Sequence, residues 1–176
     1  MALIPKKVGA NDLRDFRPIS LITGVYKIIV EVLAERLKKV IDKLVNKNQM
    51  AFIKERQITD VALIACECID TRIRGDVSGV MCKLDIEKAY EHLNWDFLIN
   101  TFRQMGFGPT WLKWIVSCIK TTRFSILVNE EPVGFFHAEK GLRQGDPLSP
   151  FLFIIAMEGY RRVGQLDEES FSKQLA

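Results

Sequence analysis

Long apolar runs are missing from this sequence. No stretch approaches the roughly 18 to 20 uninterrupted apolar residues that a membrane-spanning helix requires. The N-terminal residues, Met-Ala-Leu-Ile-Pro-Lys-Lys, also lack the charged, apolar and small-residue order of a secretory signal. These absences argue against a secreted or membrane-spanning protein, and we expect an intracellular chain of the nucleus or the cytoplasm.

Cysteine and histidine are scarce, with four cysteines and two histidines in 176 residues. The cysteines show no Cys-x-x-Cys pair, which argues against a zinc site built on the usual spacing. We therefore expect reduced cysteines in the core, and a structural zinc site is the alternative. The residues concerned are Cys66, Cys68, Cys82, Cys118, His92 and His137.

Internal repeats, low-complexity tracts and long linkers are absent as well. The hydrophobic content is 48%, which is enough for the core of one ordinary domain, and a division into two subdomains stays open. The net charge of +3 is uneven: residues 1–60 contain 12 Lys and Arg against 7 Asp and Glu, a charge of +5, and the rest contain 13 against 15, a charge of −2. Clustered cations favour a polyanionic partner, and the alternative is a set of solvated helix faces.

Several helices are predicted from apolar spacing. One amphipathic helix covers residues 25–45, and a second begins near Thr59 and Asp60 and ends at Gly75. The first is expected to bury Ile28, Ile29, Val32, Leu33, Leu37, Val40, Ile41 and Leu44. The second is expected to bury Val61, Ile64, Ala65, Cys68 and Ile69.

Later helices have clearer boundaries. Asn94 is expected to cap a helix that ends at Gly106, and Pro109 is expected to begin the next one. Ser149 precedes a helix whose residues 151–157 are apolar on every side, which predicts burial all round. The tail at 160–176 is polar and poorly patterned.

A change to a period of two predicts strands. Residues 80–84 alternate and are expected to form a strand that ends at Asp85. Residues 124–128 and 133–136 are expected to form a β-hairpin around a turn at 129–132, packed beside the Asp85 strand. Together these elements predict an α+β fold with an antiparallel sheet packed on helices.

Asp85 is the first candidate functional residue, because a carboxylate at the end of a strand, next to the backbone carbonyl of Ile86, suits one corner of a Mg²⁺ site. Nucleotidyl transfer depends on such ions. The simpler alternative for Asp85 is a turn or helix cap. Tyr90, five positions later, has a ring that could lie under a nucleotide sugar and exclude a 2′-hydroxyl, and its alternative is a core aromatic.

The segment 141–150, Gly-Leu-Arg-Gln-Gly-Asp-Pro-Leu-Ser-Pro, is the second candidate. Its two glycines permit close backbone approach, and Arg143 and Gln144 have donors that could reach a base or a phosphate. A plain helix entry is the alternative. The density of Gly, Gln, Asp and Pro before so apolar a helix favours a functional loop.

Five ordered segments resemble one known family. They are residues 2–7, 15–21, 49–60, 83–90 and 141–150, and in order and spacing they resemble the reverse transcriptase domain of non-LTR (LINE-type) retroelements, especially those of plant genomes. The resemblance covers residues 2 to about 159. It implies fingers and palm of a right-hand polymerase that uses Mg²⁺ and dNTPs to extend a DNA primer on an RNA template.

The resemblance also implies residue roles. Asp85 would be a catalytic metal ligand, Ile86 a backbone ligand and Tyr90 the steric gate. Gln144 and Gly145 would line the nucleotide pocket. The basic residues assigned to the triphosphate, the template or the nucleotide are Arg17, Lys6, Lys7 and Arg56, to which the loop adds Arg143 as a nucleic-acid contact.

One departure limits the expected activity. The Asp-Asp block that supplies the family's other metal-binding carboxylates does not occur in residues 1–176. We therefore expect fingers at 1–77, an incomplete palm at 78–159 and a divergent tail at 160–176, in a truncated domain that is inactive alone. The alternatives are a nucleic-acid-binding remnant and an inert relic, and the relic would leave Phe151 and Phe153 uncovered.

Overall fold

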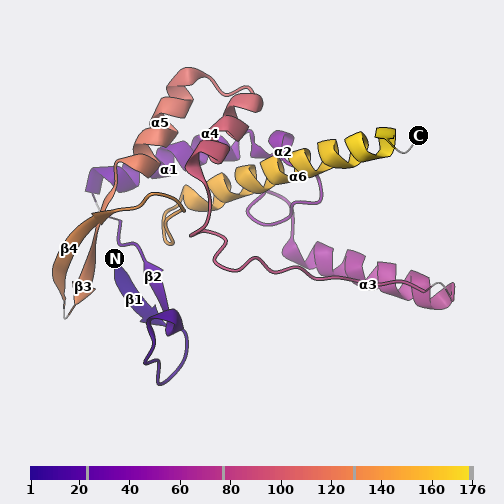
Figure 1. Cartoon of the computed structure of the whole chain (residues 1–176), viewed down its shortest axis with the longest axis horizontal. Coiled ribbons are helices and arrows are strands. Elements are labelled where there is room, and N and C mark those ends of the chain that lie inside the picture. Colours follow the sequence, from indigo (N-terminus) through magenta and orange to yellow (C-terminus); the bar gives the residue numbers. More distant parts are fainter. Residues whose placement is uncertain (23, 77, 129, 175–176) are drawn as a thin grey trace.

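The computed structural model describes residues 1–22, 24–76, 78–128 and 130–174, without the side chains of residues 165–174. Two small antiparallel hairpins accompany a group of helices (Figure 1), so the predicted α+β class is confirmed. The elements are β1 (Ala2–Pro5), a 3₁₀ turn η1 (Leu13–Asp15), β2 (Phe16–Ile19), α1 (Gly24–Lys38), α2 (Ile41–Leu44), α3 (Ile58–Arg74), α4 (Trp95–Gln104), α5 (Pro109–Lys120), β3 (Arg123–Val128), β4 (Glu131–His137) and α6 (Ser149–Gln174).

The core lies where α1, α4, α5 and the first half of α6 meet. Leu37 of α1, Phe102 of α4, Ile115 of α5 and Ile155 of α6 are each completely shielded from solvent. Full burial of one such side chain stabilises the fold by about 1.5–3 kcal/mol relative to exposure. We call these helices, with residues 141–148 and residues 149–164 of α6, the packed region.

Local signals fix the ends of α4 and α5 as predicted. The Asn94 side chain accepts a hydrogen bond from Phe97 N–H at 2.9 Å, which caps α4. Gly106 has φ +85°, a conformation that glycine adopts at little cost, and it stops the chain from continuing the helix. Pro109 is the first residue of α5.

Helix α6 begins at Ser149, as predicted, and buries its apolar start. Phe151 is 5% exposed, which confirms the predicted burial and contradicts the uncovered Phe151 expected of the inert relic. Farther along, the buried Glu158 carboxylate accepts a hydrogen bond from Asn46 N–H at 3.1 Å and pairs with Arg161 at 2.6 Å. The helix runs on to Gln174 through the segment predicted as a poorly patterned tail, and side chains beyond residue 164 lie outside the described residues.

The two hairpins lie side by side. In the first, Ala2 of β1 pairs with Ile19 of β2, and in the second, Arg123 of β3 pairs with His137 of β4. The second hairpin is the predicted one, although Asn129 of its turn lies outside the described residues. It contacts the N-terminus, because Leu127 N–H donates to the Met1 carbonyl at 2.9 Å. The expectation that it packs beside an Asp85 strand is wrong.

Helix α1 turns a different face inward from the one predicted. Its buried residues are Val30, Leu33, Ala34 and Leu37, whereas the predicted core residues Ile28, Ile29 and Val32 are 46–63% exposed. The chain breaks the helix before α2, where Val40 is also exposed. Apolar residues occur on nearly every side of this segment, so the spacing alone did not select the face that packs on α6.

Helix α3 and the irregular residues 78–86 that follow it form what we call the arm. Figure 1 shows α3 projecting away from the other helices, with the following chain running back along it. The helix ends at Gly75 as predicted, but none of its residues is buried. Residues 80–84 form no strand, contrary to prediction, because no described strand hydrogen-bonds to them.

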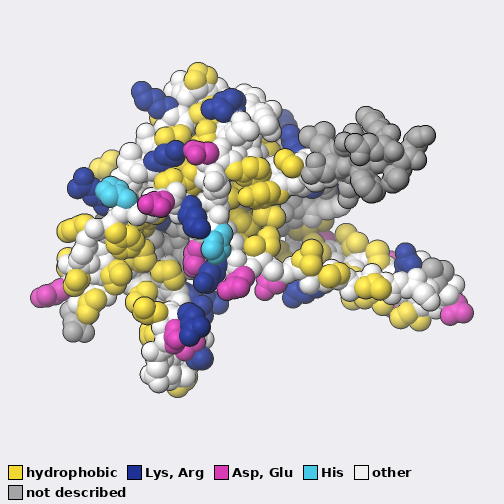
Figure 2. All heavy atoms as spheres, viewed as in Figure 1, with side chains coloured by type: hydrophobic (Ala, Val, Ile, Leu, Met, Phe, Trp, Pro, Cys, Tyr) yellow, Lys and Arg dark blue, Asp and Glu magenta, His cyan; other side chains and the backbone are white. Residues whose placement is uncertain are grey.

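Apolar side chains therefore lie exposed along the arm, among charged ones (Figure 2). Ile73 is 71% exposed and Val80 is 97% exposed. Cys66, Cys68 and Cys82 are exposed as well, so the prediction of core cysteines is wrong for these three and confirmed for Cys118. Among the described residues, no helix is both long and apolar enough to cross a lipid bilayer.

Candidate nucleotide-binding site

Residues 141–148 form a loop into α6, which we call the entry loop. Leu142 N–H donates to the Tyr90 carbonyl at 2.6 Å, and this bond fastens the start of the loop to the chain before α4. Gly141 has φ +86°, and a Cβ there would lie 2.7 Å from the Glu91 carbonyl oxygen. Glycine is required at this position both by the backbone conformation and by the close approach.

The predicted pocket residues Gln144 and Gly145 lie against the end of β2. Ser20 N–H donates to the Gln144 carbonyl at 2.9 Å. Gly145 has φ +96°, and a Cβ there would lie 3.1 Å from the Ser20 carbonyl oxygen. The fold therefore brings the entry loop next to the strand that carries Arg17.

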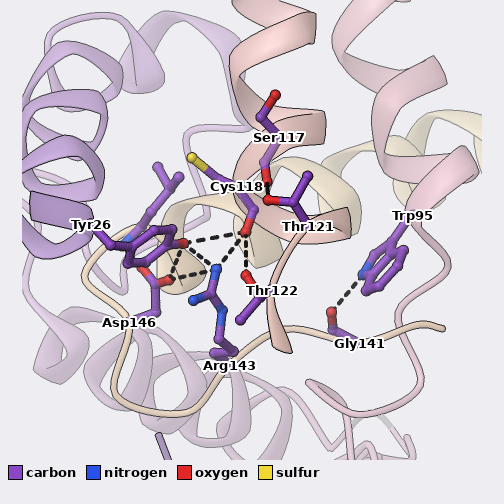
Figure 3. A network of polar contacts seen from close by, with 10 residues as sticks. Tyr26, Trp95, Ser117, Cys118, Thr121, Thr122, Gly141, Arg143 and Asp146 are labelled. Carbon is purple, nitrogen blue, oxygen red and sulfur yellow. Dashed lines mark hydrogen bonds and ion pairs between the residues drawn. The ribbon is translucent and has the colours of Figure 1, made fainter. Parts of the chain in front are cut away.

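Arg143 points into the protein, and its side chain is only 11% exposed (Figure 3). Its guanidinium donates hydrogen bonds to the Tyr26 hydroxyl and to the Cys118 carbonyl. It also lies 3.5 Å from the Asp146 carboxylate and 4.4 Å from the centre of the Tyr26 ring. These partners are all internal, which differs from the expectation that Arg143 contacts a nucleic acid.

Asp146 completes this network and was missed by the sequence analysis, as was Tyr26. The Asp146 carboxylate accepts hydrogen bonds from the Tyr26 hydroxyl at 3.1 Å and from Leu148 N–H at 2.9 Å. The second bond is a local turn that the sequence Asp-Pro-Leu-Ser could have suggested. No local signal could have identified Tyr26, which is 120 positions away.

Burial shapes the protonation of this network. Loss of solvent raises the pKa of Tyr26, and the negative charge of Asp146 raises it further, against the opposing effect of Arg143. Burial likewise raises the pKa of the Cys118 thiol. Both groups therefore stay protonated at neutral pH, and the Tyr26 hydroxyl serves as a donor to Asp146.

A pocket of about 170 Å³ lies between the entry loop, the end of β2 and the β3–β4 hairpin. Arg143, Gln144 and Asp146 line it. An apolar cavity of about 150 Å³ binds benzene, so this volume suits a single ring rather than a whole nucleotide. Asp85, Ile86 and Tyr90 are not among its lining residues.

The candidate metal ligand Asp85 lies on the arm, in an irregular and exposed stretch. No hydrogen bond or ion pair links its carboxylate to another described residue. Ile86, whose carbonyl was expected beside the metal, is 53% exposed. The carboxylate is therefore free to take a partner from outside the described part of the chain.

A magnesium ion at this place would depend on the oxygen donors around Asp85. Mg²⁺ prefers octahedral oxygen ligands and usually takes one or two carboxylates with water and substrate phosphates. Within the described ranges, no group of three or more His, Cys, Asp or Glu residues is close enough to hold a metal. Asp85 supplies one suitable oxygen donor, and the described residues do not complete a site by themselves.

Tyr90 is half-buried at the junction between the arm and the packed region. Its ring stacks on Phe153 of α6, with centroids 5.0 Å apart and planes 15° from parallel. Burial raises the pKa of Tyr90. The ring thus packs as a core aromatic, which was the alternative, and Tyr90 does not line the pocket that Gln144 lines, although its neighbour Glu91 does.

The predicted basic residues divide into two groups. Arg17 on β2 is exposed, and the described chain offers it no ion-pair partner. Lys6 donates to the Arg14 carbonyl and Lys7 pairs with Asp15 at 2.8 Å, both within the first hairpin. Arg56 instead donates to three backbone carbonyls, those of Asp42, Asn46 and Gln49, which gives it a structural role in the turns around α2.

Comparison with known proteins covers most of the chain. Residues 4–165 match the family described as reverse transcriptase (RNA-dependent DNA polymerase). The chain is 27% identical over 160 residues to the transposon TX1 uncharacterized 149 kDa protein of Xenopus laevis, 91% of the chain and 12% of that protein. It is 28% identical over 155 residues to the retrovirus-related Pol polyprotein from type-2 retrotransposable element R2DM of Drosophila melanogaster, 88% of the chain and 14% of that protein.

A third relative, the retrovirus-related Pol polyprotein from type-1 retrotransposable element R2 of Nasonia vitripennis, is 25% identical over 162 residues, 91% of the chain and 15% of that protein. The chain therefore spans 12–15% of the length of these three relatives. All three are proteins of non-LTR retrotransposons. Together with the family match, they show that this chain belongs to the reverse transcriptase family and represents a reverse transcriptase domain of a non-LTR retroelement.

Proposed function

We propose that this chain supplies the nucleotide-handling part of an RNA-directed DNA polymerase. The family match over residues 4–165 is the observation that carries the proposal. The proposal assigns residues 1–77 to fingers, residues 78–159 to palm and residues 160–176 to a divergent tail. Helix α1, in the fingers, and helix α6, which begins in the palm, share one core. The two parts are therefore distinguished by their role and do not fold separately.

In this proposal, Asp85 and the Ile86 carbonyl are two ligands of a Mg²⁺ site. The ion, when bound, would neutralise charge on the triphosphate and lower the barrier to nucleotidyl transfer. Tyr90 excludes a 2′-hydroxyl, and Gln144 and Gly145 contact the nucleotide. The exposed, unpaired carboxylate of Asp85 and the fixed backbone of the entry loop support these assignments.

The 176-residue polypeptide is expected to incorporate no nucleotide on its own. Metal-assisted phosphoryl transfer depends on ions that bridge attacking and leaving oxygens, and one carboxylate holds such ions poorly. The check is a primer-extension assay with the purified chain, a DNA primer on an RNA template, dNTPs and Mg²⁺. Processive incorporation that Asp85→Asn abolishes would contradict this expectation.

Nucleotide and metal binding test the proposal directly. Mn²⁺, which takes the same oxygen ligands, is titrated with dATP into the full chain, and the free ion is followed by its electron paramagnetic resonance signal. We expect Asp85→Asn to weaken Mn²⁺–dATP binding at least about tenfold, since the ion loses its one charged protein ligand.

The matched control is Asp70→Asn on α3, another exposed carboxylate of the arm. It should leave the binding unchanged. Equal binding by the wild type and Asp85→Asn, or no binding by the wild type, overturns the assignment of Asp85 to the metal site.

A second candidate function, nucleic-acid binding by the N-terminal hairpin, is favoured by the exposed and unpaired Arg17. Neutralising a residue that contacts a phosphate should weaken binding to all sequences. It should also reduce, by about one, the slope of the logarithm of the binding constant against the logarithm of the salt concentration. We expect this for Arg17→Gln in RNA-binding titrations at several salt concentrations. Arg14→Gln is the control, because Arg14 already pairs with Asp12 at 2.7 Å.

Binding that is indifferent to both salt and Arg17 would exclude this candidate. Arg56 is unsuitable for the same test. Its guanidinium holds three backbone carbonyls, so its replacement would change the fold as well as the charge.

A further inference from the structure

One buried side chain connects the entry loop to the helices behind it. Arg143 reaches from the loop to the last turn of α5 and the first turn of α1 (Figure 3). A guanidinium that is 11% exposed has lost most of its water, and this loss is costly unless charges and hydrogen bonds replace it. The surroundings of Arg143 provide that replacement on three sides.

Each partner comes from a different element. The Asp146 carboxylate, 3.5 Å away and itself buried, supplies the opposite charge. The Cys118 carbonyl belongs to the end of α5, where free carbonyls carry partial negative charge and favour a cation. Tyr26 of α1 presents its ring face 4.4 Å from the guanidinium carbon. Arg143 therefore joins α1, α5 and the entry loop.

The neighbouring residue is fixed from the opposite direction. Gln144 has its carbonyl hydrogen-bonded to Ser20 N–H at 2.9 Å, at the end of β2. Gln144 thus lies between two anchors, the Arg143 side chain among the helices and the Ser20 amide beside the strand. The Gln144 carbonyl is only one residue along the backbone from the anchored Arg143 side chain.

We propose that Arg143 is a positioning residue, which orients the nucleotide-binding part of the entry loop through its contacts with Tyr26, Cys118 and Asp146. The contact of Gln144 and Gly145 with a nucleotide rests on the proposed function. The anchoring itself does not depend on that function. A residue that only stabilised the fold would change amide exchange at both hairpins alike, whereas a positioning residue changes it first where the entry loop is bonded.

Amide hydrogen exchange in the full chain, measured by NMR, separates these two roles. The reporter is Ser20 N–H, whose acceptor is the Gln144 carbonyl, and the control is Leu127 N–H, whose acceptor is the Met1 carbonyl at 2.9 Å. Arg143→Lys keeps the positive charge but removes the planar guanidinium, whose Nη2 donates to both Tyr26 and Cys118 and whose central carbon lies over the Tyr26 ring. We expect exchange at Ser20 to rise at least about tenfold in this variant, with Leu127 unchanged.

Tyr26→Phe is the milder variant, which retains the ring and removes only the hydroxyl bonded to Asp146. It should accelerate Ser20 exchange in the same direction and to a smaller extent, and it carries the test if Arg143→Lys does not fold. Unchanged exchange at Ser20 in the folded variants overturns the proposal. Equal acceleration at Ser20 and Leu127 overturns it too, because that pattern belongs to global destabilisation.

Nucleotide binding is measured by NMR in the same samples. With Mg²⁺ and dATP, the wild type should show a shift of the Gln144 backbone amide signal, and Arg143→Lys should need more dATP for the same shift. Absence of any shift in the wild type counts against the proposed function and leaves the Ser20 comparison as the test of positioning. A shift that is the same in both proteins counts against Arg143 as a positioning residue.

Discussion

The packed region and the arm carry different parts of the candidate site and are held in different ways. In the packed region, Ile155 is 0% exposed and the entry loop is fixed by hydrogen bonds from three sides. On the arm, Ile73 is 71% exposed and residues 78–86 have no regular structure. The position of Gln144 is therefore fixed by hydrogen bonds to its neighbours. The Asp85 carboxylate has no hydrogen-bond or ion-pair partner among the described residues.

The two halves of the site therefore differ in what they need to become ordered. The loop is ordered by contacts that already exist within the chain. The carboxylate of Asp85 lies in a segment whose alternating apolar residues, such as Val80 and Leu84, meet no strand among those described. Because a strand is stabilised by its neighbours, a sequence with strand character stays irregular when it is unpaired.

Breaking the buried ion pair should produce the largest effect. Asp146→Ala leaves Arg143 buried without its countercharge, which should destabilise the protein by about 3–5 kcal/mol. Asp70→Ala on the arm removes an exposed carboxylate 4.0 Å from Arg74 and should change stability little. Urea unfolding followed by circular dichroism compares the two. Similar unfolding midpoints for both variants would contradict the contrast between the regions.

Replacing an isoleucine by alanine in each region should give the second-largest difference in stability. Ile155→Ala in α6 should lower the free energy of unfolding by about 2–5 kcal/mol, since it leaves a cavity in a closed core. Ile73→Ala in α3 should change it by less than about 0.5 kcal/mol, because the side chain is already in water. Chemical denaturation measures both. A large loss at Ile73 would show that the arm is packed in solution.

Replacing a glycine by alanine should strain the backbone of the packed region more than that of the arm. Gly141→Ala would bring a Cβ within 2.7 Å of a rigid backbone oxygen at φ +86°, and strain of this kind costs about 1–3 kcal/mol. Gly79→Ala on the arm would meet the Arg72 side chain at 2.9 Å, and this side chain is able to move. Thermal unfolding should therefore show a clear loss for the first variant and almost none for the second.

Glu158 predicts a smaller, pH-dependent effect in the packed region. Burial alone would raise the pKa of Glu158, but hydrogen bonds from Arg161, Asn46 N–H and Arg162 outweigh it and hold the pKa below its ordinary value of 4.5. A carboxyl whose pKa is lowered by folding stabilises the protein above its unfolded pKa, and this contribution is lost as the pH falls through the folded pKa.

The comparison uses Glu158→Gln, which cannot titrate. Between about pH 6 and pH 3, the wild type should lose more unfolding free energy than this variant. Parallel pH profiles of unfolding would contradict a role of the Glu158 carboxylate in joining α6 to the turn after α2.

Local signals in the sequence were sufficient to predict the ends of several helices. Asn94, Gly106 and Pro109 define the ends of α4 and α5, and Gly75 ends α3, because capping and backbone freedom act within a few residues. The alternation before and after the turn at 129–132 was sufficient for the β3–β4 hairpin.

Features that depend on distant partners could not be predicted in this way. The buried face of α1 is decided by α6, and the apolar side of α3 was expected to be covered but has no buried residue in the described chain. The contacts of Arg143 required the fold, because Tyr26 is 117 positions away from it. Asp85 was identified by its segment and by family resemblance, and its metal-binding role stays a prediction.

The most direct test asks whether the arm and the entry loop meet at one nucleotide. Mn²⁺ broadens NMR signals of nearby amides, so a Mn²⁺–dATP titration of the isotope-labelled chain locates the ion. We expect the signals of Asp85 and Ile86 to broaden together with those of Gln144 and Gly145, and Asp85→Asn to remove both effects. Broadening of one pair without the other, or broadening that survives Asp85→Asn, would contradict it.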